Sequence, residues 1–160
     1  AESGFTPLYT AASRGCIEMV ELLMLHKADP NQKIGNGATA LFACFRTKKI
    51  PLDVVLCLVK HKADATVVNK AGSSTLQLAL EKQAPDDVVR ALMDAKSDPN
   101  QEDVAGLSLL HHMCAQVNPK TTPSSVCRLL SLKADVNRRL SSGRTCLHQA
   151  AGCKKGDLII

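Results

Sequence analysis

The sequence is poor in aromatic residues, which make up 2% of its 160 residues, and it contains no tryptophan. A close-packed core must therefore be built from Leu, Val, Ala, Met and Cys, and these smaller side chains suit closely stacked helices. The chain also has no apolar run near the ~20 residues that a bilayer-spanning helix needs, so we expect no membrane insertion. No secretory signal is recognised, because the chain opens directly on Gly4-Phe5-Thr6-Pro7.

The cysteines do not form a disulfide framework. There are seven of them, which is an odd number, and most lie inside apolar helical patterns. This pattern predicts free, buried thiols in a reducing compartment. We therefore expect an intracellular protein of the cytoplasm, with the nucleus left open.

Signatures of metal binding and of catalysis are also lacking. His148 lies between Cys146 and Cys153, but the pairs of closely spaced ligands that a closed zinc site needs are absent. Cys114 follows His111 by about one helical turn, yet no oxyanion hole or third orienting group accompanies them. The glycines occur singly and form no phosphate-binding loop. The sequence therefore predicts no enzyme activity, no metal and no cofactor.

No single sign of charge dominates the chain, although its net charge is +5. Residues 1–45 carry a net charge of −1, residues 46–80 of +4, residues 81–118 of −4 and residues 119–160 of +6. A nucleic-acid-binding protein more often has one continuous basic face. Alternating signs favour a protein partner of mixed charge.

An internal repeat organises the whole sequence. The motif Lys-Ala-Asp, or Lys-Ser-Asp in one copy, ends at residues 29, 64, 98 and 135, and a glycine follows each Asp by eight residues. A fixed period of this kind is typical of repeat architectures. The repeats run approximately over residues 1–33, 34–68, 69–102, 103–139 and 140–160, with the last one cut short, and together form a single array over residues 1–160.

Each repeat is predicted to hold two helices. A hydroxyl residue that can cap the first helix follows each glycine, and these residues are Thr6, Thr39, Ser74, Ser108 and Thr145. The second helix shows apolar residues at helical spacing, as at Val55, Leu58 and Val59. Its predicted first-turn prolines are Pro51, Pro85 and Pro123. The longest turn between paired helices spans residues 117–123, where Thr122 is expected to cap the helix that Pro123 starts.

The units resemble ankyrin repeats, whose pattern runs Gly-x-Thr-Pro-Leu-His-x-Ala-Ala, then a second helix, then Gly-Ala-Asp-x-Asn. The first repeat matches through Thr6-Pro7-Leu8 and Ala28-Asp29-Pro30-Asn31, and the fifth through Thr145-Cys146-Leu147-His148. A lysine replaces the glycine before Ala-Asp in every repeat that has the motif, which we expect to weaken local caps. The resemblance implies an all-α solenoid of stacked helix-turn-helix units with extended β-type turns between repeats.

The resemblance also implies a protein–protein interaction module, a scaffold or adaptor. In this family the partner meets the turn tips and the outward residues of the first helices. The corresponding tip residues here are Lys33, Asn36, Lys70, Glu102, Asp103, Arg138, Arg139 and Arg144. The corresponding first-helix residues are Arg14, Arg46, His112 and Gln149. The tips run weakly basic, acidic and then strongly basic, so charge complementarity would select the partner, including one with an acidic segment.

Two other functions stay open. The chain could be the regulatory or targeting segment of a larger enzyme or channel, because the fifth repeat stops within the apolar stretch Leu158-Ile159-Ile160 and we expect the natural protein to continue. The basic C-terminal tips could instead bind phosphate or nucleic acid, although aromatic residues for stacking on bases are missing there. We expect the isolated chain to be monomeric.

Overall fold

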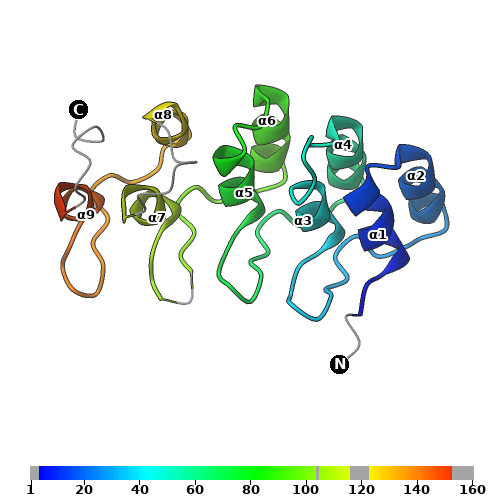
Figure 1. The fold of residues 1–160 in the computed structure, drawn as a ribbon, viewed down its shortest axis with the longest axis horizontal. Coiled ribbons are helices and arrows are strands. Elements are labelled where there is room, and N and C mark those ends of the chain that lie inside the picture. The colour runs from blue at the N-terminus through cyan, green and yellow to red at the C-terminus, as the bar shows by residue number, and fades with distance from the viewer. Residues whose placement is uncertain (1–3, 104, 116–122, 153–160) are drawn as a thin grey trace. The chain divides into compact units, whose positions relative to one another are not determined.

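The computed structural model describes residues 4–103, 105–115 and 123–152 of the chain. Its described part is helical, and the helices come in pairs along the chain (Figure 1). The pairs are α1 (Pro7–Arg14) with α2 (Ile17–Leu25), α3 (Ala40–Cys44) with α4 (Leu52–Lys60), α5 (Thr75–Glu81) with α6 (Asp86–Asp94), and α7 (Leu109–Ala115) with α8 (Pro123–Ser131). The helix α9 (Cys146–Gly152) follows. The cap expected at Thr122 and the end of the fifth repeat lie outside the described residues.

The chain forms two compact units, Ala1–Ser97 and Asp98–Ile160. The N-terminal unit contains α1 to α6, and the C-terminal unit contains α7 to α9.

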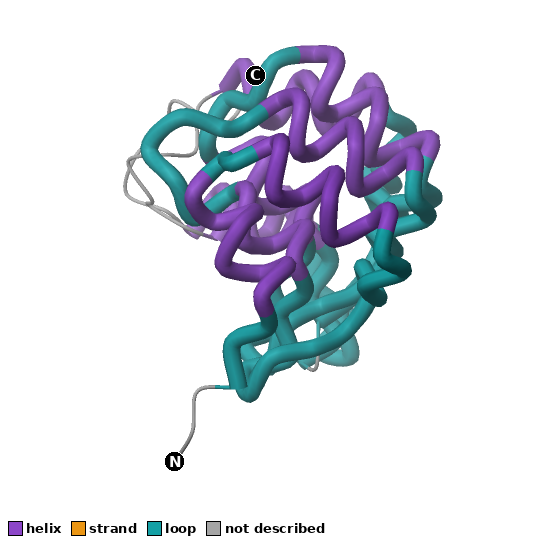
Figure 2. Tube along the Cα trace, turned by 90° about the vertical axis from the view of Figure 1, so that its right-hand side faces the viewer, coloured by secondary structure: helices purple, strands orange, loops and turns teal. Residues whose placement is uncertain are grey.

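The helices of the N-terminal unit lie in two rows. Helix α1 packs against α2 and α3, α2 packs against α4, and α4 packs against α3 and α6, while α5 packs against α6. The first row therefore consists of α1, α3 and α5, and the second row of α2, α4 and α6 (Figure 1). The turns between repeats project from one side of the helices (Figure 2). In the C-terminal unit, α7 packs against both α8 and α9.

Hydroxyl caps begin the first-row helices, with one exception. Thr6 Oγ1 accepts a hydrogen bond from the Tyr9 amide at 3.0 Å, and Ser74 Oγ accepts one from the Gln77 amide at 3.1 Å. Such caps pair amides that the first helical turn leaves free. Thr39 differs from the prediction, because its buried hydroxyl has no hydrogen-bond partner among the described residues. The helix that it precedes, α3, has five residues.

The prolines that precede the second-row helices lie one position earlier than predicted. Pro51 and Pro85 are the residues just before α4 and α6, and both have extended ψ angles of 91° and 154°. Pro123 is the first residue of α8, as the sequence predicts. A proline fits at both positions because its missing N–H leaves no helical hydrogen bond unmade.

Left-handed backbone recurs at two positions of the repeat pattern in the described residues. The predicted turn glycines Gly37, Gly72, Gly106 and Gly143 have φ angles between 75° and 81°. At Gly37 a Cβ atom would also lie 3.3 Å from the Lys70 backbone nitrogen. The lysines that replace the family's glycine also have positive φ, between 62° and 65°, and they are Lys27, Lys62, Lys96 and Lys133. A side chain resists this conformation, whereas glycine does not.

Apolar side chains fill the interior of each unit. The largest fully buried side chains include Leu41, Phe42 and Phe45 of the second repeat and Leu129 of α8. Burial of this surface is the main source of stability in a repeat protein, because one helix pair alone cannot cover its apolar face. None of the helices in the described ranges is both long enough and apolar enough to cross a membrane.

Candidate protein-binding surface

The turn tips of the N-terminal unit are joined through their backbones. The carbonyl of Asn36 accepts a hydrogen bond from the Lys70 amide at 2.9 Å, although the two residues belong to different repeats. Asn36 Oδ1 also accepts from the Ala38 amide at 3.0 Å, which fixes the turn locally. The side chains of Lys33, Asn36 and Lys70 are exposed. The structure thus brings two predicted contact residues, Asn36 and Lys70, together on a braced loop edge.

The tips of the C-terminal unit carry an ion pair that the sequence analysis missed. Arg138 Nη2 lies 2.7 Å from Glu102 Oε1, and Arg138 Nε donates to the same oxygen at 2.8 Å. Arg139 Nη1 donates to the Gly143 carbonyl at 3.3 Å, and Arg144 is exposed. Glu102 and Arg138 therefore offset each other's charge, and the contrast between an acidic and a strongly basic tip is smaller than the sequence order suggests.

Asp103 and His112 connect a tip of the C-terminal unit to helix α7. His112 Nε2 lies 2.7 Å from Asp103 Oδ2, while Asp103 Oδ1 accepts from the amides of Ala105 and Leu107 at 2.8 and 2.9 Å. Burial acts to raise the pKa of Asp103, but the hydrogen bonds from Leu107, His112 and Ala105 outweigh it and hold the pKa below its usual value. Both side chains are largely committed to this contact, with 9% of Asp103 and 24% of His112 exposed.

Basic side chains gather where the first-row helices of the N-terminal unit end. Arg14 is the last residue of α1, and Arg46 follows α3 by two residues. Both are exposed, and Arg46 Nη1 approaches the Tyr9 hydroxyl at 3.5 Å. Lys82 Nζ donates to the Thr47 carbonyl at 2.6 Å, which brings a third cation to this edge. Cations at helix C-termini are favoured by the helix dipole.

Gln149 does not have the outward position that the sequence analysis gave it. Its Oε1 is buried and has no hydrogen-bond partner among the described residues, and its side chain is half-buried. The histidines of these helices bond to the hydroxyls that precede them. His111 Nδ1 lies 2.7 Å from Ser108 Oγ, and His148 Nδ1 lies 2.8 Å from Thr145 Oγ1. Both imidazoles therefore contact the hydroxyl residue that precedes their own helix.

The prediction of buried thiols is correct for only some of the cysteines. Cys44, Cys114 and Cys146 are buried, Cys57 is half-buried, and Cys16 and Cys127 are exposed. The prediction failed for the exposed pair because Cys16 lies in the turn between α1 and α2, whereas Cys127 lies on the solvent side of α8. Within the ranges that the structure describes, no three His, Cys, Asp or Glu side chains are grouped to hold a metal ion.

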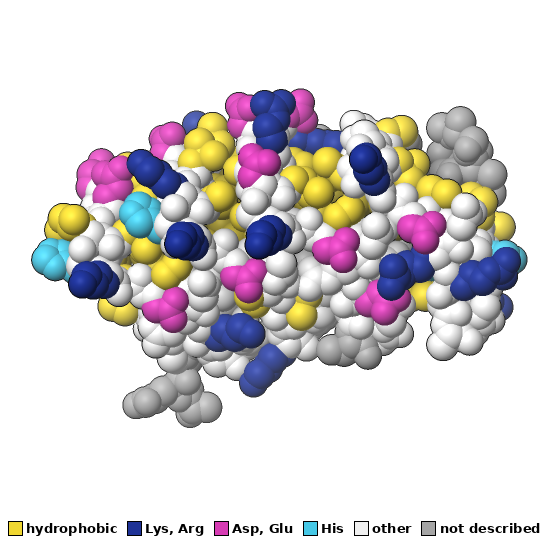
Figure 3. All heavy atoms as spheres, turned by 180° about the vertical axis from the view of Figure 1, so that it is seen from behind, with side chains coloured by type: hydrophobic (Ala, Val, Ile, Leu, Met, Phe, Trp, Pro, Cys, Tyr) yellow, Lys and Arg dark blue, Asp and Glu magenta, His cyan; other side chains and the backbone are white. Residues whose placement is uncertain are grey.

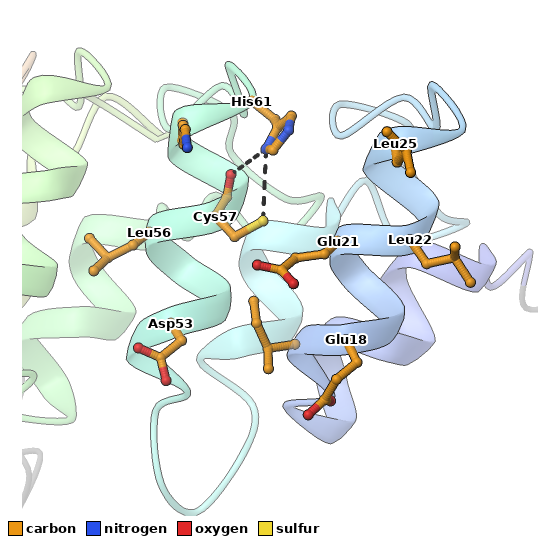
Figure 4. A pocket seen from close by; sticks show the side chains of 10 residues that line it. Glu18, Glu21, Leu22, Leu25, Asp53, Leu56, Cys57 and His61 are labelled. Atoms are coloured by element: carbon orange, nitrogen blue, oxygen red, sulfur yellow. Dashed lines mark hydrogen bonds between the residues drawn. The ribbon is translucent and has the colours of Figure 1, made fainter.

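A groove of about 860 Å³ lies over the second-row helices α2 and α4 (Figure 4). In this view Glu21 and Cys57 point toward each other between the two helices, and Leu22 and Leu56 lie on the outer flanks. His61 Nδ1 approaches the Cys57 carbonyl at 2.9 Å. Sequence reasoning missed this groove, because its leucines obey the same apolar spacing as the core.

The comparisons with known proteins agree with the repeat structure. A family model described as ankyrin repeats, in three copies, matches residues 8–103. The chain belongs to the ankyrin-repeat family. It is 29% identical over 108 residues to the B-cell lymphoma 3 protein homolog of Mus musculus, a match that covers 65% of this chain and 24% of that protein. It is 32% identical over 146 residues to the Nuclear factor NF-kappa-B p100 subunit of Xenopus laevis, covering 85% of this chain and 14% of that protein.

This ankyrin-repeat chain thus spans about a quarter or less of the length of these relatives. Ankyrin repeats are generally protein-binding modules, and no catalytic domain is recognised in the matched region. On the face that Figure 3 draws, acidic and basic side chains are interspersed and not separated by sign. Such a surface is suited to a partner that is matched in charge pattern.

Proposed function

We propose that this ankyrin-repeat chain is a protein-binding module that holds a partner through its turn tips and the exposed residues of its first-row helices. The observation that carries the proposal is the braced loop edge of the N-terminal unit, where the Asn36 carbonyl and the Lys70 amide join neighbouring tips. A fixed backbone lowers the entropy lost on binding, because the tips are ordered before the partner arrives.

The charges favour a partner with an acidic segment. Lys33, Lys70, Arg139 and Arg144 are exposed at the tips, and the chain as a whole is basic. Arg138 is less available, because Glu102 binds its guanidinium group. Exposed cations at an interface speed association with an acidic partner and align it on the surface.

We also propose that the chain binds its partner without catalysing a reaction, and that it does so inside the cell. The free cysteines of the described ranges fit a reducing compartment, where the cytoplasm is proposed and the nucleus stays open. The printed name of one relative, a nuclear factor subunit, describes a member of a protein assembly. This supports a protein as the partner without identifying it.

The test compares two charge variants in quantitative affinity capture from an extract of the source cells, followed by direct binding to the captured protein. Arg139→Glu with Arg144→Glu is expected to weaken a saturable interaction by at least tenfold, because it reverses the exposed tip charges. The matched control, Arg90→Glu with Lys96→Glu, reverses the same amount of charge at exposed residues on and just after the second-row helix α6, away from the tips. It is expected to change affinity by less than threefold.

The proposal fails for this face if the double reversal leaves affinity unchanged while circular dichroism shows an intact fold. It also fails if the purified chain retains no saturable protein partner. Retention on heparin that disappears at modest salt, together with binding to unrelated DNA sequences of equal strength, would instead support the nucleic-acid alternative.

A further inference from the structure

Two exposed leucines at the α2–α4 groove stand where the neighbouring repeats carry charge. Leu25 lies four residues before the repeat's Asp and is 76% exposed, while Lys60 and Asp94 hold that place in the second and third repeats. The architecture of the repeat therefore does not require an apolar side chain there. An exposed leucine at such a position is therefore better explained by a contact surface than by packing in the core.

The same comparison sets Leu56 apart. It lies eight residues before its Asp and is 41% exposed, whereas Glu21 and Arg90 hold that place in the first and third repeats. Leu22, at 49% exposed, extends the apolar surface on α2. Three leucines on two adjacent helices thus line this groove and expose apolar surface. Figure 4 shows Leu22 and Leu56 on its two outer flanks.

The groove is locally acidic on a chain that is basic overall. Glu18, Glu21 and Asp53 line it, against one lysine, Lys60. Glu21 and Asp53 form no ion pair with another residue of the described ranges. Figure 4 shows Glu18 and Asp53 at one end of the groove and His61 at the other. The acidic end coincides with the N-termini of α2 and α4, since Glu18 and Asp53 are the second residues of these helices.

We propose that this groove binds an amphipathic helix of a partner protein, whose apolar side chains contact Leu22, Leu25 and Leu56 and whose basic residues face Glu18, Glu21 and Asp53. The groove follows two helices of nine residues each, which are about 14 Å long. It therefore accommodates about two and a half turns of the bound helix, with apolar anchors at i, i+3 or i+4, and i+7.

The charges also set the direction of the bound helix. It runs antiparallel to α2 and α4, with its C-terminal end beside Glu18 and Asp53. Basic residues are favoured at a helix C-terminus by that helix's own dipole, and here they also meet the two carboxylates. The negative end of the bound helix then lies beside the positive ends of α2 and α4.

The probe is a synthetic helical peptide with leucines at i, i+3 and i+7 and three lysines in its C-terminal half. The matched peptide carries glutamate in place of each lysine. Fluorescence anisotropy with the full 160-residue chain is expected to show saturable binding of the lysine peptide and at least tenfold weaker binding of the glutamate peptide. Amide chemical shift changes are expected to be largest in α2 and α4.

Variants of the chain test the apolar contacts. Leu25→Lys and Leu56→Arg place at each position a residue that another repeat already carries there, so the fold is expected to persist. Each substitution is expected to lower the affinity for the lysine peptide at least fivefold. The matched control is Leu147→Lys, which changes a leucine that is 61% exposed on α9, and it is expected to leave the affinity unchanged. The Arg139→Glu, Arg144→Glu variant is also expected to bind the peptide normally, which separates this site from the tip surface.

Several results would overturn the proposal. These are equal binding of the two peptides, unchanged affinity in the Leu25→Lys, Leu56→Arg double variant, or shift changes centred on the first-row helices. Sedimentation that shows a dimer abolished by Leu25→Lys would assign the groove to a second copy of the chain. Binding to phosphatidylcholine vesicles that the same substitution abolishes would assign it to a lipid surface.

Discussion

Asp64 donates its backbone amide hydrogen to the side-chain oxygen of Asn31, over 2.7 Å and across the boundary between two repeats. The amide nitrogen of the same Asn31 side chain donates to the Lys62 carbonyl at 3.2 Å. The C-terminal unit repeats this link, because Asn100 Oδ1 accepts from the Asp135 amide at 2.7 Å and its Nδ2 donates to the Lys133 carbonyl at 3.3 Å. One asparagine thus pairs two backbone groups of the following turn.

Replacing Asn31 by alanine is expected to lower the free energy of unfolding by about 1–2 kcal/mol, because two hydrogen bonds between repeats are lost. Urea denaturation measures the change, and Asn100→Ala provides the equivalent test in the other unit. Gln32→Ala, which changes an exposed neighbour, serves as the control and is expected to stay within about 0.5 kcal/mol of the parent. A loss no larger than the control's would show that the links add nothing to stability.

Leu129→Ala is expected to destabilise the chain by about 2–5 kcal/mol, because the side chain is fully buried and its removal leaves a cavity. The adjacent Leu130 is 38% exposed on the same helix, so Leu130→Ala should cost about 1 kcal/mol or less. Chemical denaturation of the two variants side by side gives the difference. Equal losses would contradict the packing assigned to α8.

The cysteines are expected to react with iodoacetamide in the order of their exposure. Burial raises the pKa of Cys44 to about 12, against a weaker opposing hydrogen bond with the backbone of Cys44 itself, so little thiolate exists at pH 8. The exposed Cys16 and Cys127 should be alkylated at least tenfold faster. Peptide mass spectrometry over a time course measures the rates, and the differences should vanish in denaturant. Rapid labelling of Cys44 under native conditions would refute the assignment.

The Asp103 carboxylate is expected to make part of the stability depend on pH. Its pKa in the folded chain lies below its ordinary value of 3.8, so this contribution is fully present well above pH 3.8 and is lost as the pH falls through the folded-state pKa. Asp103→Asn keeps an acceptor for the Ala105 and Leu107 amides but removes the charge beside His112. The difference in unfolding free energy between parent and variant should therefore be larger at pH 6 than at pH 3.

Urea denaturation at a series of pH values measures that difference for Asp103→Asn. The control is Gln32→Ala, because it changes an exposed side chain that carries no titratable group. Its difference from the parent should change little between the two pH values. An Asp103→Asn curve that stays parallel to the parent curve throughout would contradict a stabilising role for the carboxylate.

Local signals in the sequence were sufficient to predict the fold. The eight-residue offset to Gly37 and Gly72 reflects a turn that needs left-handed backbone, and a hydroxyl at Thr6 or Ser74 reflects the free amides of a helix start. These requirements act within a few residues, so they are visible in one sequence. Thr39 shows the limit, because a hydroxyl in the right place forms no cap there.

The binding surface was less predictable, because its features depend on residues from different repeats. The Glu102–Arg138 pair joins residues 36 positions apart, and nothing in the local pattern specifies that they meet. Gln149 occupies a first-helix position in the sequence, yet its oxygen is turned into the protein. Leu25 and Leu56 could have been singled out only by comparing the same position across repeats, since their periodicity matches that of core residues.

Four lysines have positive φ, one at the end of each complete repeat. The strain at these positions keeps the stability of the fold below the value that the same backbone could reach. Each side chain adds strain of roughly 1–2 kcal/mol to a left-handed corner, of which glycine would relieve a part after its own entropy cost of about 0.5–1 kcal/mol. The four lysines are exposed, so their replacement would not disturb the packed interior. Replacing the four lysines by glycine is thus expected to give a more stable array. The same replacement removes four positive charges that contribute to solubility.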